Sequence, residues 1–211
     1  MFKLFSVVEK VESPYNGTIE VVRDLSGTRI LVGGISQSGW LLKRVWKTAL
    51  KKLRKDGFVP AKVLLLGVGG GSVIELIEDF WPDAKITGIE IDPLMINLGK
   101  KYLKLGKARN LEIEIHDATD WFSKNKERRF DLVLIDLYVG SRIPEKFKGE
   151  KFIKLVEHSL SGSGIAAFNH LYSSLEREDA HNLEGKLRKV FGVITRVQPE
   201  ANIVYLCYRN S

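Results

Sequence analysis

Cysteine is almost absent from the sequence: Cys207 is the only one, which excludes an intrachain disulfide. No apolar run reaches the roughly 20 residues that a membrane helix needs. The apolar stretch at the N-terminus is short and interrupted by Glu9, so we do not expect a secretory signal. Zinc-ligand spacings, a P-loop, low-complexity tracts and internal repeats are also missing, and we expect no bound metal. These absences predict a cytoplasmic protein.

What the sequence does contain is an ordinary globular composition with an excess of positive charge. Of the 211 residues, 44% are hydrophobic and 28% are charged, and the formal net charge is +7. A chain of this length can form one good-sized domain with a substantial core. Much of the excess charge lies in Lys43–Lys55 and Lys100–Arg109, which both have the pattern of amphipathic helices. Solvated helix faces account for these lysines, so a nucleic-acid partner stays open but is not favoured.

The first part of the chain is expected to form a small N-terminal unit. Residues 1–36 have the pattern of strands, and two of these, Thr18–Asp24 and Thr28–Gly34, are separated by a short glycine-containing connection. That spacing predicts a β-hairpin. A basic amphipathic helix follows from about Gly39 to Lys55. We therefore assign residues 1–57 to this unit.

Residues 58–211 are expected to form one α/β domain, because strand and helix patterns alternate along them. The expected strands are Lys62–Leu66, Ile86–Ile91, Leu111–Ile115, Leu132–Ile135 and Gly164–Phe168, and the expected helices are Ser72–Phe80, Pro93–Leu105, Ala118–Lys124, Glu150–Leu160 and Leu175–Phe191. Two last strands, GVITRVQ and NIVYLCYR, are so close in sequence that they must be antiparallel. The predicted fold class is therefore α/β, a Rossmann-like, doubly wound, seven-stranded and mostly parallel sheet with an antiparallel last strand.

The segment AKVLLLGVGGGSVIELI, Ala61–Ile77, joins an apolar strand to a helix through a glycine-rich turn. Such a turn brings backbone N–H groups and the positive end of the helix dipole close to a ligand. Gly67, Gly69 and Gly71 fit a G-x-G-x-G pattern, whereas Ser72 replaces the third glycine of the dinucleotide pattern. We therefore predict that Gly67, Gly69 and Gly71 bind a nucleotide cofactor, with a tight turn that binds nothing as the alternative.

Acidic residues follow the next two strands where a nucleoside would need them. Glu90 ends the strand about 20 residues after the loop, where its carboxylate can accept hydrogen bonds from both hydroxyls of a ribose. Asp92 precedes Pro93 and is expected to cap the following helix. Asp117 can accept the amino group of adenine, cap the helix that begins at Ala118, or do both. We include Glu90, Asp117 and Ala118 in the predicted cofactor site.

In this order the motifs resemble the spermidine-synthase-like branch of the class I S-adenosylmethionine-dependent methyltransferase superfamily. The resemblance rests on VLLLGVGGGSVIELI, ITGIEIDPLMI, IEIHDATDWF and RFDLVLIDLYVGSRIP, and on the N-terminal YNGTIEVVRDLSGTRILVGGISQS. It implies S-adenosylmethionine, or its decarboxylated form, as the cofactor, and a last strand that lies between the fifth and the sixth. It also implies that Gln37 touches the cofactor, and it makes the N-terminal hairpin an element of a homodimer.

The resemblance fails at two positions that matter for the reaction. Spermidine synthases have an aspartate in the glycine loop and a second aspartate in the motif after the fourth strand, and these carboxylates hold and deprotonate a cationic amine. This sequence has Gly70 and Val139 there. Without a carboxylate at position 70, the carboxylate of intact S-adenosylmethionine is tolerated near the helix start after Gly71. We therefore favour a methyltransferase that acts on an unidentified small-molecule acceptor.

Other functions stay open. An aminopropyltransferase, or polyamine synthase, would use decarboxylated S-adenosylmethionine. A non-catalytic binding module would keep the cofactor site and lose the acceptor site. A nicotinamide-dependent oxidoreductase is disfavoured by Ser72 and by the antiparallel last strand. RNA as the methyl acceptor would show a steep salt dependence of binding, and a membrane partner is not expected.

Asp136 is the residue that we expect to carry the chemistry, and it is also part of the predicted cofactor site. It ends the fourth strand, where open α/β sheets present their substrates, and its carboxylate can orient or deprotonate a nucleophile. Tyr138 follows two residues later and offers an aromatic face to a methyl-sulfonium cation. The alternative for Asp136 is that it only ends the strand and caps a turn.

The remaining candidates are assigned ordinary roles. The histidines lack metal-ligand spacing. His170 follows the fifth strand and is expected to be an ordinary loop histidine, with a place at the edge of the site as the alternative. The tryptophans are expected to lie in the core, and they are Trp40, Trp46, Trp81 and Trp121. The loop Leu137–Glu150 is expected to form one wall of the acceptor site, where Arg142 and Lys146 hint at an acidic or phosphorylated acceptor.

Overall fold

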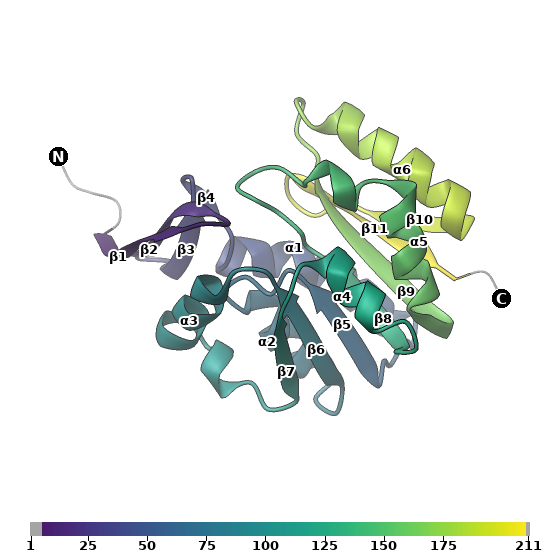
Figure 1. Cartoon of the computed structure of the whole chain (residues 1–211), viewed down its shortest axis with the longest axis horizontal. Helices are drawn as coiled ribbons and strands as arrows, with labels where there is room; N and C mark the ends of the chain where they lie inside the picture. Colours follow the sequence, from purple (N-terminus) through teal and green to yellow (C-terminus); the bar gives the residue numbers. More distant parts are fainter. Residues whose placement is uncertain (1–5, 210–211) are drawn as a thin grey trace.

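The computed structural model describes residues 6–209, which form two β-sheets (Figure 1). Sheet A is antiparallel and consists of β1 (Ser6–Ser13), β2 (Gly17–Asp24), β3 (Gly27–Val32) and β4 (Ile35–Ser36), paired in that order. The predicted hairpin is β2 and β3, and it is confirmed. β1 and β4 extend it on either side. The part of the expected strand region that falls on residues 1–5 lies outside the described residues.

Sheet B has seven strands in the order β10-β11-β9-β8-β5-β6-β7. The strands are β5 (Lys62–Leu66), β6 (Lys85–Glu90), β7 (Leu111–Ile115), β8 (Phe130–Ile135), β9 (Leu160–Leu171), β10 (Val193–Val197) and β11 (Asn202–Tyr208). β5 to β9 are parallel, whereas β11 is antiparallel to both of its neighbours, β9 and β10. The predicted Rossmann-like sheet is therefore confirmed, including the place of the last strand between the fifth and the sixth.

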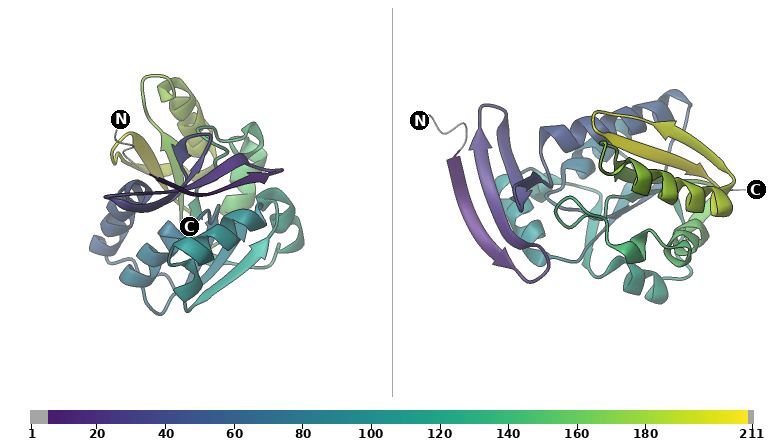
Figure 2. Two further views of the ribbon diagram at one scale, coloured as in Figure 1. Left: turned by 90° about the vertical axis from the view of Figure 1, so that its left-hand side faces the viewer. Right: turned by 90° about the horizontal axis from the view of Figure 1, so that it is seen from above.

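Helices cover both faces of sheet B (Figures 1 and 2). α1 (Trp40–Lys55), α2 (Ser72–Phe80) and α3 (Pro93–Tyr102) pack on one face, and α4 (Ala118–Lys124), α5 (Glu150–His158) and α6 (Arg177–Phe191) pack on the other. Alternate residues of β5 serve the two cores: Val63 and Leu65 face the first, and Leu64 and Leu66 face the second. Burial on both faces explains why this strand is a continuous aliphatic run.

Sheet A stands beside sheet B and does not extend it (Figure 2). The buried side chains of Ile19 and Ile30 pack against Met95 and Leu98 of α3. α1 leads from sheet A into sheet B, and its buried residues, among them Val45, lie in the core under sheet B. α1 therefore packs against sheet B. The division of the chain at residue 57 stays a prediction.

A buried carboxylate joins the two parts. Asp92 Oδ1 accepts a hydrogen bond of 2.9 Å from the backbone N–H of Leu94, which confirms the predicted cap of α3. Asp92 Oδ2 accepts hydrogen bonds from Ser13 Oγ at 2.5 Å and from Asn16 Nδ2 at 2.7 Å. The same side chain thus starts the helix and holds the turn between β1 and β2 against it.

Several element ends differ from the prediction, among them those of α3, β9 and α5, which ends at His158 and leaves Leu160 to β9. α3 stops at Tyr102, where Leu103 takes an extended backbone conformation, and the chain continues into a 3₁₀ turn over Leu105–Lys107. Leu105 lies close to Gly71 at the start of α2. β9 is longer than expected because it pairs with β8 on one side and with β11 on the other. Within residues 6–209, no helix has the length and apolar character to cross a membrane.

Candidate cofactor and acceptor site

A cavity of about 340 Å³ opens at the carboxyl ends of β5, β6, β7 and β8. The strand order reverses between β5 and β8, and open α/β sheets bind their ligands at such a switch point. Sheet A closes one side through Tyr15 and residues 35–37. The predicted site residues that line the cavity are Gln37, Gly67, Gly69, Glu90, Asp117, Ala118, Asp136 and Tyr138, whereas Gly71 does not line it. The roles assigned to all of these residues stay predictions.

The glycine loop brings two strands into close contact. Gly67, Gly69 and Gly71 have φ values of 88°, 53° and 87°, which strain any residue with a Cβ. A Cβ at Gly67 would collide with the backbone carbonyl of Asp136. Gly71 is the N-cap of α2, and a Cβ there would lie 2.7 Å from Leu105 Cδ1. Gly71 therefore supports the loop from behind the cavity.

Glu90 is buried at the end of β6 and holds the glycine loop directly. Its Oε2 accepts a hydrogen bond of 2.8 Å from the backbone N–H of Gly69, and its Oε1 accepts from those of Ile91 (2.9 Å) and Asp92 (3.1 Å). Burial raises the pKa of Glu90 above its ordinary value, although these three donors act against it. Oε2 keeps a lone pair for a further donor, such as a ribose hydroxyl.

Asp117 has two sets of partners at the start of α4. Its Oδ1 accepts hydrogen bonds from the backbone N–H groups of Thr119 and Asp120, so it is the N-cap that the sequence predicted. Its Oδ2 accepts a hydrogen bond of 2.6 Å from Lys146 Nζ. Burial acts to raise the pKa of Asp117, but Lys146 and the backbone donors outweigh it, so the pKa lies below its ordinary value. Whether Asp117 also binds adenine stays a prediction.

Asp136 lies at the end of β8 with two neutral donors on its carboxylate. Trp46 Nε1, from α1, donates to Oδ2 at 3.0 Å, and Asn169 Nδ2, from β9, donates to Oδ1 at 2.9 Å. Asn202, at the start of β11, in turn donates from Nδ2 to Asn169 Oδ1 at 2.9 Å, which fixes the orientation of that amide. Burial raises the pKa of Asp136, and the two donors lower it only in part. This carboxylate is therefore a better proton acceptor than an exposed one.

Tyr138 is tied to the neighbouring strand. Its hydroxyl donates a hydrogen bond of 3.3 Å to the backbone oxygen of Asn169. Burial and then the nearby charge of Asp136 raise the pKa of Tyr138 well above its ordinary value. The phenol therefore stays neutral at physiological pH, which makes it a donor and not a base.

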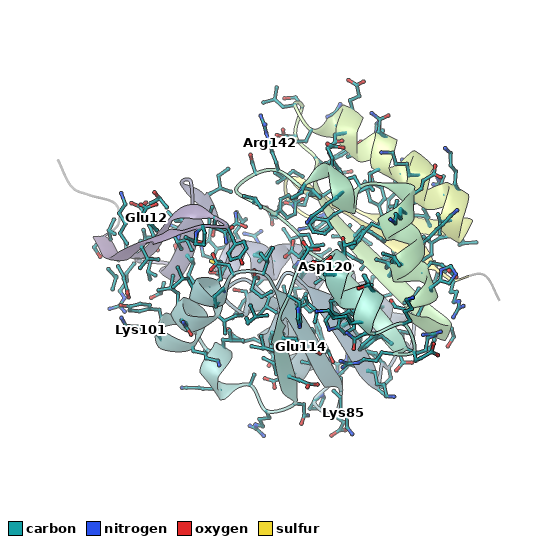
Figure 3. All side chains as sticks on the ribbon, in the orientation of Figure 1. Glu12, Lys85, Lys101, Glu114, Asp120 and Arg142 are labelled. Atoms are coloured by element: carbon teal, nitrogen blue, oxygen red, sulfur yellow. The ribbon has the colours of Figure 1, made fainter. Side chains whose placement is uncertain are left out.

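The segment between β8 and α5 forms a wall of the cavity, as the sequence predicted. Gln37 Nε2 donates to the backbone oxygen of Gly140 at 2.8 Å, which ties this wall to sheet A. Arg142 is exposed and lies at the turn of the wall (Figure 3). Lys146 is bound to Asp117, so its charge is already matched within the chain. The expected hint at an acidic acceptor therefore rests on Arg142 alone.

A buried lysine paired with an exposed and a partly exposed carboxylate lies at the far end of this wall. Lys148 Nζ donates to the two carboxylate oxygens of Asp179 at 2.9 and 2.7 Å and lies 2.6 Å from Glu145 Oε1. Burial acts to lower the pKa of Lys148, but the carboxylates outweigh it and raise the pKa. His170 was expected in a loop; it is instead buried on β9, with Nε2 3.1 Å from Asp179 Oδ2 and Nδ1 2.6 Å from the backbone oxygen of Leu171.

The two positions that depart from spermidine synthases differ in their surroundings. Gly70 does not line the cavity, and a Cβ there would lie 2.6 Å from Leu103 Cδ1 and 2.9 Å from Ser38 Oγ. An aspartate at position 70 would therefore require the side chains of Leu103 and Ser38 to move. Val139 lines the cavity and is exposed at its mouth. Within the described part of the chain, the acidic residues that line the cavity are Glu90, Asp117 and Asp136.

Sequence analysis missed the two residues that bind Asp136, Trp46 and Asn169, and also Asn202, which orients Asn169. Trp46 was placed in the core and is fully buried there, but its N–H serves the site. Asn169 and Asn202 had no signal beyond a polar residue at the end of a strand. Trp40, also expected in the core, is exposed at the start of α1. Residues 6–209 contain no group of three or more His, Cys, Asp or Glu that could hold a metal ion.

Residues 48–203 match the family model of the spermine/spermidine synthase domain. The chain is 34% identical over 177 residues to the polyamine aminopropyltransferase of Prochlorococcus marinus, covering 76% of this chain and 59% of that protein. It is 29% identical over 171 residues to the eEF1A lysine and N-terminal methyltransferase homolog of Drosophila melanogaster, covering 76% of this chain and 24% of that protein. The chain thus spans less than two thirds of either relative.

Solved structures share the fold at lower identity. A probable spermidine synthase from Corynebacterium glutamicum superimposes with a TM-score of 0.78 at 17% identity, covering 96% of this chain and 80% of that chain. Human methyltransferase-like protein 13 in complex with SAH superimposes with a TM-score of 0.63 at 20% identity, covering 81% of this chain and 80% of that chain. The scaffold is therefore common to proteins named for aminopropyl transfer and for methyl transfer.

Proposed function

Because the chain belongs to the spermine/spermidine synthase domain family, we propose that it is an S-adenosylmethionine-dependent transferase, and specifically a methyltransferase. The observation that carries this choice is the set of carboxylates in the cavity. Glu90 and Asp117 are assigned to the nucleoside, and Asp136 alone is left for the acceptor. A diamine needs one carboxylate to hold its distal ammonium and another to accept the proton of the attacking amine, and positions 70 and 139 provide neither.

The described residues fit the cofactor. Glu90 Oε2 has a lone pair for a ribose hydroxyl, and Asp117 and Ala118 line the part of the cavity assigned to adenine. Gly67, Val68 and Gly69 line the cavity beside Glu90, whereas the start of α2 after Gly71 does not. The preference for intact S-adenosylmethionine over its decarboxylated form therefore rests on the missing carboxylates at positions 70 and 139. When bound, the cofactor supplies a methyl group on a cationic sulfur.

The chain's own contribution is to orient the acceptor and to accept a proton. Asp136 takes that proton on its carboxylate, whose raised pKa favours proton transfer from a nucleophile. Trp46 and Asn169 fix both carboxylate oxygens, so the acceptor is held in one direction. Tyr138 lines the same cavity and adds an aromatic face for a cation.

A calorimetric titration with S-adenosylmethionine, beside its decarboxylated form, tests the proposal. We expect the intact cofactor to bind more tightly, and we expect Glu90→Gln to weaken both titrations because the variant loses a charged acceptor for the ribose. Tighter binding of the decarboxylated form would instead favour aminopropyl transfer, the second candidate, which the Prochlorococcus relative supports. If neither compound binds, the cofactor assignment is wrong.

A further inference from the structure

Asp136 is the cavity-lining carboxylate that is left without a positive or backbone partner among residues 6–209. Glu90 is held by three backbone N–H groups, and Asp117 is paired with Lys146. The hydrogen-bond partners of Asp136 are an indole and an amide, which are both neutral. A desolvated carboxylate without a cation is unfavourable, so the floor of the cavity attracts one positive charge.

The walls that lead from this floor to solvent are apolar. Along α1 the exposed fraction falls from 42% at Leu41 to 2% at Val45, and the next residue, Trp46, binds Asp136. On the β8 side, the chain passes from Asp136 to Val139, which is 45% exposed. All of the apolar residues named here except Trp46 line the cavity. Such walls suit methylene groups, because a second ammonium would lose its hydration there without a carboxylate in return.

The mouth of the cavity carries exposed apolar side chains from separate segments. Tyr15, Ile35, Leu41 and Val139 are all exposed, and all of them line the cavity. The hydrogen bond from Gln37 to Gly140 holds two of these segments together. A small amine inside the cavity would leave this rim in water, whereas residues that flank the amine in a longer chain would cover it.

From these observations we propose that the acceptor is a polypeptide that inserts one lysine side chain, with apolar residues beside that lysine. The inference rests on the proposed transferase function. The lysine ammonium meets Asp136, its methylene stem lies along α1, and its apolar neighbours cover the rim formed by Tyr15, Ile35, Leu41 and Val139. A phosphate-rich acceptor is disfavoured, because it would bring charge of the same sign toward Asp136.

The test measures binding to the full chain by calorimetry, without cofactor and again with SAH. The probes are n-butylamine, putrescine and two blocked pentapeptides in which a central lysine lies between leucines or between serines. We expect the leucine peptide to bind about tenfold more tightly than the serine peptide and n-butylamine, because it buries apolar area on the rim. Asp136→Asn should weaken the leucine peptide about tenfold or more, because the charge pair is lost.

Rim variants give the discriminating comparison. Ile35→Ser should weaken the leucine peptide roughly threefold to tenfold and leave n-butylamine unchanged, because Ile35 lies on the rim and not on the wall formed by α1. Leu41→Ser should weaken both probes, because Leu41 belongs to the rim and to that wall. Val193→Ser is the matched control, since Val193 is an exposed apolar residue on the edge strand β10. Circular dichroism checks that each variant is folded.

The outcomes separate the two proposals. Putrescine binding as tightly as the leucine peptide would overturn the lysine assignment, and so would rim variants that bind the peptide like the wild type. The lysine assignment would also be overturned if the chain bound S-adenosylmethionine but bound none of the amine and peptide probes. If the peptide binds in the expected way and S-adenosylmethionine does not, the acceptor site stands and the proposed cofactor is wrong.

Discussion

The indole N–H of Trp46 donates a hydrogen bond of 3.0 Å to Asp136 Oδ2, across 90 positions of sequence. α1, which precedes the parallel sheet in the chain, therefore contributes directly to the acid at the centre of that sheet. The contact makes the buried face of a basic helix part of the candidate site. The charge state of Asp136 can therefore be probed by substituting Trp46, which is not itself acidic.

Replacement of Trp46 by Phe removes this donor and leaves the apolar ring. Asp136 then keeps only Asn169, so its pKa, already raised by burial, should rise further. A carboxyl with a raised folded pKa contributes stability that is present below its unfolded pKa and lost as pH rises through the folded pKa. We expect the variant to lose about 1–3 kcal/mol of unfolding free energy, with a larger loss at pH 8 than at pH 5.

Urea denaturation at both pH values measures this difference. Trp81→Phe is the control, because Trp81 Nε1 donates to the neutral backbone oxygen of Phe58. The loss of unfolding free energy in Trp81→Phe should therefore be the same at pH 5 and pH 8. Equal losses at pH 5 and pH 8 for Trp46→Phe would mean that the indole does not stabilise a charged carboxylate.

Restoring an aspartate at position 70 should not restore a diamine site. A Cβ there would meet Leu103 and Ser38, so Gly70→Asp should lower the unfolding free energy by about 1–3 kcal/mol through overpacking. Gly162→Asp is the matched control, because a Cβ at Gly162 meets nothing within 4 Å. Leu103→Ala in the same chain should recover part of the loss. Gain of putrescine-dependent turnover by Gly70→Asp alone would show that the loop can open.

Acidification should weaken the ion pair between Asp117 and Lys146, because it protonates the carboxylate. The pKa of Asp117 is lowered, so its stabilisation is complete above its ordinary value of 3.8 and is lost as pH falls through the lower folded value. Asp117→Asn should therefore cost up to about 1 kcal/mol at pH 7, because the pair is partly exposed, and progressively less as pH falls through the lowered folded pKa. Thermal unfolding across this range measures it, with Asp120→Asn as the exposed control on the same helix. Lys146→Met should show only the part of this pH dependence that comes from the ion pair, because the backbone N–H groups of Thr119 and Asp120 still bind Asp117. The double variant should lose no more than Asp117→Asn alone.

The buried ammonium of Lys148 should hold the wall of the cavity in place. Lys148→Met leaves Asp179 and Glu145 without their cation, and because both are partly solvated we expect a loss of about 1–3 kcal/mol. Chymotrypsin should cut more rapidly at Phe147, which is buried beside Lys148. Lys151→Met is the control, an exposed lysine on α5. Unchanged cleavage in Lys148→Met would mean that other contacts hold the wall.

The elements could be predicted where local pattern decides them. The aliphatic run of β5, the glycines after it and the aspartate caps at Asp92 and Asp117 each act over a few residues, so sequence analysis placed them. Gly71 shows the limit of a motif, because its left-handed backbone is required behind the cavity rather than in its lining. A periodic glycine pattern does not reveal which of its members faces a ligand.

Contacts that depend on strand order could not be predicted in the same way. Asn202 reaches Asn169 only because β11 inserts beside β9, and the pairing register sets Asn202 opposite Leu171. Trp46 was correctly expected in the core, but its hydrogen bond to Asp136 was not. His170 was expected in a loop because the predicted strand ended at Phe168, whereas β9 continues to Leu171. The general tendency of a residue type to be buried indicates where its side chain lies, but it does not identify the hydrogen-bond partner of its polar atom.

The insertion of β11 between β9 and β10 also sets an order of events for a chain leaving the ribosome. At about 5–20 residues per second, β9 and β10 emerge before the strand that must separate them, and the edge of β9 waits unpaired until β11 arrives. Asn202 comes with that strand, so the glycine loop and its acids are synthesised well before the support of Asp136 is complete. A nascent chain can thus have every motif of the site and still lack a finished acceptor floor.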